Sequence, residues 1–101
     1  MVGTPYTLAV WRVIPGQEAA FIEAWKGLSA IFRQLPHPPT DIGTLVQSLS
    51  DPTLFYSFGA WRSFDDIQAM RTDAQAQEGI RKLREMCTEA MPGGYKVVAE
   101  A

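Results

Sequence analysis

Cysteine and histidine are scarce in this chain, which has one of each among its 101 residues. The single Cys87 cannot form an internal disulfide. One histidine and one cysteine are also too few for the ligand clusters that hold zinc and other transition metals, so we expect no metal site. The sequence has no glycine loop that would cradle a phosphate, no dinucleotide fingerprint and no serine in a nucleophile-elbow motif.

Positive charge and long apolar runs are lacking as well. Nine Lys and Arg stand against eleven Asp and Glu, which gives a formal net charge of −2. Nucleic-acid binding needs a basic stripe, and none is present. No apolar run reaches the roughly 18 residues of a membrane span, and the chain does not open with a signal-peptide pattern. We therefore expect no nucleic-acid partner, no membrane association and a cytoplasmic protein.

Four segments have the composition of strands in a chain whose length suits one domain, residues 1–101. They are rich in β-branched and aromatic residues and are bounded by turn residues. The expected strands are 6–13, 42–49, 53–61 and 95–99.

Helical periodicity fills the intervals, because apolar residues recur there at spacings of three and four. The expected helices are 17–33, one that starts at Phe64 behind a Ser63 N-cap, and 75–91. Gly27 suggests a close approach of the first helix to the sheet. Pro92 and the glycines after it should end the last helix, with Cys87 on its apolar stripe as a small buried hydrophobe.

This order of elements predicts a ferredoxin-like α+β fold, a four-stranded antiparallel sheet with helices on one face. Such a sheet should alternate apolar and polar residues, yet the strand 53–61 is apolar on both faces. One face would carry Leu54, Tyr56, Phe58 and Ala60, and the other Phe55, Ser57, Gly59 and Trp61. No spare segment is long enough to cover the second face, so we expect a homodimer that packs sheet against sheet.

Two runs of residues resemble a known family. Residues 10–25, VWRVIPGQEAAFIEAW, look like the opening of antibiotic biosynthesis monooxygenase domains of the dimeric α/β barrel superfamily. Residues 51–63, DPTLFYSFGAWRS, are similar to their third strand, an aromatic strand that ends in Trp before a helix begun by Ser. The resemblance implies a pocket between the sheet and its own helices, with the other sheet face forming the dimer barrel.

The resemblance also implies a function, a cofactor-independent monooxygenase acting on an aromatic or polyketide-like small molecule. Such a reaction needs a phenol or enol that supplies electrons to oxygen, inside a dry aromatic pocket. By similarity Trp61 lines the pocket, and His37 is the only histidine, the residue type that most often serves as a general base. The candidate catalytic residues are His37 and Trp61, and the candidate substrate-binding residues are Trp11, Trp25, Phe55, Ser57, Gly59 and Met70.

Alternatives remain for these residues and for the function. Trp61 suits plain core filling equally well, and a lone loop histidine is more often solvated. Arg12 suits a salt bridge at a strand end better than an anion site. The thin supply of acid–base groups favours a non-catalytic small-molecule-binding or stress-related dimer. Haem degradation is disfavoured, because that branch carries an Asn in its first strand and a His in a helix; this chain contains no Asn, and no expected helix contains His.

Overall fold

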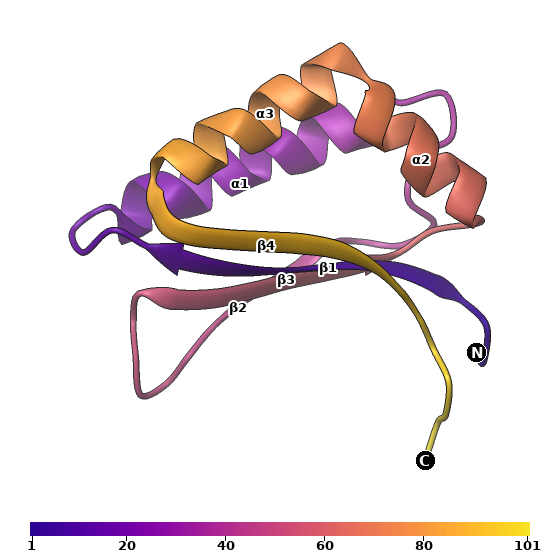
Figure 1. The fold of residues 1–101 in the computed structure, drawn as a ribbon, viewed down its shortest axis with the longest axis horizontal. Coiled ribbons are helices and arrows are strands. Elements are labelled where there is room, and N and C mark those ends of the chain that lie inside the picture. The colour runs from indigo at the N-terminus through magenta and orange to yellow at the C-terminus, as the bar shows by residue number, and fades with distance from the viewer.

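Four strands and three helices make up the computed structural model, which describes residues 1–101. In chain order they are β1 (Pro5–Val13), α1 (Glu18–Arg33), β2 (Thr44–Gln47), β3 (Leu54–Ala60), α2 (Phe64–Thr72), α3 (Ala74–Glu85) and β4 (Cys87–Lys96). The strands form one antiparallel sheet in the order β2-β3-β1-β4. The helices all lie on one side of it, as Figure 1 shows. The predicted ferredoxin-like α+β fold is therefore confirmed.

The main core lies between α1 and the centre of the sheet. Phe21 of α1 is fully buried, with its ring centroid 5.6 Å from that of Trp11 and 5.1 Å from that of Phe55. Leu28, two turns further along the same helix face, is buried too. These contacts place the predicted apolar stripe of the first helix against β1 and β3.

Gly79, and not Gly27, marks a close approach between elements. A Cβ atom on Gly79 would lie 2.7 Å from Cδ1 of Leu28, so an alanine at that position would require the end of the Leu28 side chain to shift. Gly27 is exposed, and a Cβ there would have no neighbour within 4 Å. The expected approach of Gly27 to the sheet is therefore wrong.

The last helix and the last strand differ most from the prediction. α3 ends at Glu85, where the sequence predicted helix as far as Met91, and β4 runs from Cys87 to Lys96. Cys87 thus begins a strand and is only partly buried. Residues 87–91 form a strand because β4 pairs along the whole of β1, which would otherwise be an edge of the sheet. Pro92 is tolerated since β4 is the edge strand, where a missing N–H can face outward.

The opposite sheet face is apolar and carries no helix. Tyr56 and Phe58 of β3, Met91 and Tyr95 of β4 and Val46 of β2 are all exposed, with relative exposures from 37% to 58%. The register places them together, since Val46 pairs with Tyr56, and Val10 of β1 lies between Tyr56 and Met91. We call this surface, formed by those five side chains, the open face.

Two local predictions are confirmed. Ser63 caps α2, with its hydroxyl accepting the N–H of Asp66 at 3.2 Å. Arg12 forms a salt bridge at the strand end, Nη1 to Oδ2 of Asp51 at 3.0 Å. As for membranes, none of the helices combines the length and the apolar character that a crossing would require.

Candidate functional site

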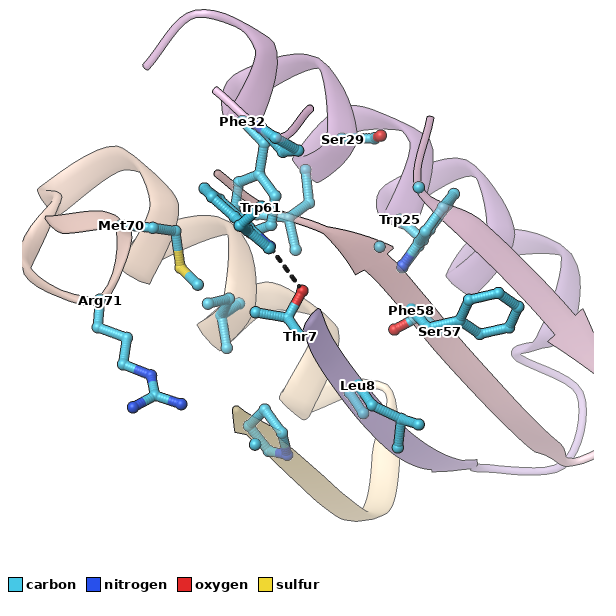
Figure 2. A pocket seen from close by; sticks show the side chains of 18 of the residues that line it. Thr7, Leu8, Trp25, Ser29, Phe32, Ser57, Phe58, Trp61, Met70 and Arg71 are labelled. Carbon is cyan, nitrogen blue, oxygen red and sulfur yellow. Dashed lines mark hydrogen bonds between the residues drawn. The ribbon is translucent and has the colours of Figure 1, made fainter. Parts of the chain in front are cut away.

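A cavity of about 340 Å³ lies between the sheet and its helices. β1 and β3 form its floor, and α1, α2 and α3 form its walls (Figure 2). This volume falls in the lower part of the range of small-molecule sites, roughly 300–1,000 Å³. The cavity is therefore large enough for a small organic ligand.

Four residues of the helix-facing side of the sheet shape the floor. Thr7 pairs across the strands with Gly59, and Ala9 pairs with Ser57. The four residues form the corners of a square on the sheet. The small Ala9 and Gly59 occupy one diagonal of this square and leave room above the sheet. Thr7 and Ser57 occupy the other diagonal, at a separation of about 7–8 Å for such positions. The floor is thus flat in the middle, with a hydroxyl at two opposite corners.

Each of these hydroxyls is held by a tryptophan. Nε1 of Trp61 donates to Oγ1 of Thr7 at 2.9 Å, drawn as the dashed line in Figure 2, and Nε1 of Trp11 donates to Oγ of Ser57 at 2.9 Å. A hydroxyl that accepts in this way still has its own proton to donate. No acceptor in the protein takes the proton of Thr7 or of Ser57. Both O–H groups are therefore free to donate to an oxygen atom of a ligand.

The walls are aromatic and aliphatic. α1 contributes Trp25 and Phe32, and α2 contributes Met70, whose sulfur lies on the cavity side in Figure 2. Phe32 meets the ring of Trp61 edge-on, with the ring centroids 5.6 Å apart. Because Trp61 is buried as well as hydrogen-bonded, it is fixed in one orientation at the end of β3.

Charge at the cavity comes from its rim. Arg33, Arg71 and Arg84 line the cavity together with a single carboxylate, Asp41. Oδ1 of Asp41 accepts the N–H of Ile42 at 2.7 Å. The formal charge of the cavity lining is therefore +2, from three arginines and one aspartate, although the net charge of the whole chain is −2.

The structure brings six of the eight predicted site residues to this cavity. They are Trp11, Trp25, Ser57, Gly59, Trp61 and Met70. Phe55 lies on the same face of β3 but deeper, against Phe21 in the core. His37 is exposed and does not line the cavity; its Nδ1 is 3.4 Å from Nη2 of Arg62. The proline-rich loop turns His37 outward, so its assignment as the base within the pocket is not supported by its position.

Sequence reasoning missed Thr7, Asp41 and the three arginines. Thr7 could have been predicted, because it lies on the same face of its strand as Ala9 and Trp11. Asp41 lies in an irregular loop and carries no periodic signal. The arginines stand near the ends of three different helices, and only the packing of those helices brings them to one cavity.

Comparison with known proteins finds likeness of structure at low sequence identity. No protein-family model matches the chain, and no curated protein sequence matches it either. SnoaB, a cofactor-independent oxygenase from Streptomyces nogalater, superposes with a TM-score of 0.85 at 15% identity, over 97% of this chain and 96% of SnoaB. A candidate antibiotic biosynthesis monooxygenase from Bordetella bronchiseptica gives 0.81 at 21%, over 96% and 99%. A conserved protein from Methanosarcina mazei gives 0.81 at 16%, over 95% and 94%. The chain therefore has the fold of the antibiotic biosynthesis monooxygenase-like structures.

Proposed function

We propose that this protein is a cofactor-independent monooxygenase acting on a flat, oxygenated aromatic or polyketide-like small molecule. The observation that carries the proposal is the pair of hydroxyls, Thr7 and Ser57, fixed by indole N–H groups on the floor of an apolar cavity. The shared fold with SnoaB supports the same reaction class. An apolar wall with a few fixed donors is what binding and orienting such a compound requires.

In a reaction without a cofactor, the substrate itself must supply the electrons that reduce O₂. When a methylene group is oxidised to a carbonyl by O₂, one oxygen atom enters the product and the other leaves as water, so the substrate supplies all four electrons. The difficult step is ionisation of the substrate to an electron-rich phenolate or enolate. Donors that bind the anion better than the neutral form lower the pKa of the bound group. Thr7 and Ser57 would act in this way on two ligand oxygens.

A proton acceptor other than His37 is needed at the cavity. Asp41 is the only carboxylate on the lining, and it is exposed to water that could carry the proton away. We assign the proton to Asp41 or to water beside it. Haem degradation stays disfavoured, since none of the helices contains a histidine.

The homodimer belongs to the same proposal. The open face places five exposed apolar side chains on one surface, and no segment of the chain covers it. A second copy that packs its own open face there would bury both. Sedimentation at micromolar concentration should give a dimer, and Tyr56→Asp, at a position of the open face that does not line the cavity, should give a monomer. A wild-type monomer under these conditions would refute this part of the proposal.

Oxygen uptake tests the reaction directly, with a panel of phenols, quinols and anthrone-like compounds. Saturable uptake should fall at least roughly tenfold in Thr7→Val and Ser57→Ala, in line with loss of a donor aimed at a developing anion. Thr88→Val is the matched control, because Thr88 is an exposed hydroxyl residue of β4 that does not line the cavity.

The second candidate function is binding without turnover, favoured by the absence of a histidine from the cavity. Compounds that bind and raise the melting temperature but consume no oxygen would establish that function and refute catalysis.

A further inference from the structure

The six arginines of the chain fall into two groups. Arg12, Arg62 and Arg81 lie away from the cavity, and each is paired with at least one carboxylate. Arg33, Arg71 and Arg84 line the cavity, and none of them has a carboxylate within 4 Å. An arginine carries its charge at any ordinary pH and is suited to bidentate binding of an anion. The unpaired arginines are therefore those that a bound molecule could reach.

Helix position alone does not account for this grouping. Each of the three stands in the last turn of its helix, where a cation is favoured by the helix dipole on any side of the helix. Arg84, however, shares the cavity side of α3 with Gln77 and Ile80, at spacings of seven and four residues. Lys82, in the same last turn, does not line the cavity.

Arg71 is the most firmly placed of the three. Its Nη1 donates to Oε1 of Gln68 at 3.0 Å, whereas no hydrogen bond to a protein group holds Arg33 or Arg84. Figure 2 shows Arg71 extending from α2 toward β4. There its Nη2 lies 3.2 Å from the position that a Cβ on Gly94 would occupy, and nothing else lies within 4 Å of that position. Gly94 pairs with Thr7, so the guanidinium lies at the edge of the floor that carries the two hydroxyls.

We propose that the site selects an amphipathic acid: an apolar aromatic body in the cavity and a carboxylate at the rim, bound chiefly by Arg71 and assisted by Arg33 and Arg84. This inference rests on the proposed function for the site itself and adds the charge of its ligand. A fixed guanidinium loses little freedom on binding, and charge-assisted hydrogen bonds to a carboxylate are roughly twice as strong as neutral ones. Gly94 is assigned a positioning role, because it leaves the space in which Arg71 lies.

Isothermal titration calorimetry with two probes of the same shape tests the proposal. We expect 2-naphthoate to bind on the order of tenfold more tightly than 2-naphthamide, a ratio equal to one charge-assisted contact. Added salt should lower the affinity for the acid and leave that for the amide nearly unchanged. Equal affinities for acid and amide would overturn the inference and leave the cavity and the proposed reaction intact.

Two variants and one control locate the effect. Arg71→Gln should lower the acid-to-amide ratio by at least about threefold, because the bidentate contact between two charged groups is lost while Arg33 and Arg84 remain at the rim. Gly94→Ala should lower the same ratio with little effect on the amide, because its Cβ displaces only the end of the Arg71 side chain. Lys82→Gln removes the same charge from an exposed position outside the cavity and should keep the wild-type ratio.

The other results separate this inference from the function on which it rests. A ratio unchanged in Arg71→Gln would refute the role of Arg71, and a ratio lost equally in Lys82→Gln would refute a local site. Acid selectivity without oxygen uptake by any aromatic acid would refute the monooxygenase and leave the selectivity established. If neither probe binds, both proposals fall.

Discussion

The Trp11–Ser57 hydrogen bond provides the sharpest test of how the floor of the cavity is held. Both side chains are buried, with relative exposures of 3% and 9%. Ser57→Ala removes the acceptor and leaves the indole N–H of Trp11 without a partner in a site that excludes most water. Stranding a buried donor costs about 1–3 kcal/mol, so we expect a loss of about 2 kcal/mol in the free energy of unfolding. For a chain of this size that loss corresponds to a fall of roughly 8–16 °C in melting temperature.

A double-mutant cycle separates this cost from any other effect of the serine. In a Trp11→Phe background no indole N–H remains to be stranded, so Ser57→Ala should then cost less than about 0.5 kcal/mol. The assay is urea unfolding followed by circular dichroism, with all variants at one protein concentration because association would shift the apparent stability. Ser29→Ala is the control, since Ser29 lines the cavity without a hydrogen bond and Ala suits a helix. Equal costs of Ser57→Ala in the two backgrounds would refute the reasoning.

Three further predictions concern the scaffold. Gly27→Ala should raise the free energy of unfolding by about 0.5–1 kcal/mol, because Gly27 is an exposed helix position with open space at its Cβ. Gly79→Ala should lower it by about 1 kcal/mol, because the new Cβ would lie 2.7 Å from Leu28. Urea unfolding of the two variants measures both changes. Burial raises the pKa of the Cys87 thiol, so iodoacetamide should alkylate native Cys87 more slowly than the unfolded chain at pH 8, and equal rates would contradict this. Hydrogen bonds from Thr53, with a further contribution from Arg12, lower the pKa of Asp51. The contribution of Asp51 to stability is therefore present at neutral pH and is lost as the pH falls through that lowered pKa. Asp51→Asn should destabilise the protein at pH 7, and the difference from wild type should shrink as the pH is lowered.

Strand parity explains why the sequence predicted most of the cavity. Once β1 and β3 are assigned as strands, Trp11, Ser57 and Gly59 must share one face, whatever the details of the packing. The register shift that could have reversed the parity falls between Arg12 and Val13 on the β4 side, beyond the cavity floor. The face assignment therefore needed only the correct identity of two strands.

The misjudged features depend on tertiary pairing, which a local pattern does not contain. Residues 87–91 have the composition of a helix, yet β4 forms there because β1 offers its full edge for pairing. Pro92 reads as a helix stop in isolation and is in fact an edge-strand residue paired with Ala9. Similarly, nothing in the loop sequence tells that Asp41 lines the cavity while His37 does not.

The cavity and the open face share one layer of backbone, and this links binding to assembly. In β1 Ala9 lines the cavity, and the neighbouring Leu8, which also lines it, pairs with Phe58 of the open face. A sheet with one wet face can bend and twist, and the Thr7–Ser57 separation on the floor would vary with it. A second copy against the open face would limit this bending and so keep the two hydroxyls at one spacing. Tyr56→Asp should therefore weaken binding of a dioxygenated aromatic ligand as well as the dimer, although Tyr56 lies on the open face and does not line the cavity. Monomeric Tyr56→Asp protein that binds such a ligand with wild-type affinity would show that the floor needs no such support.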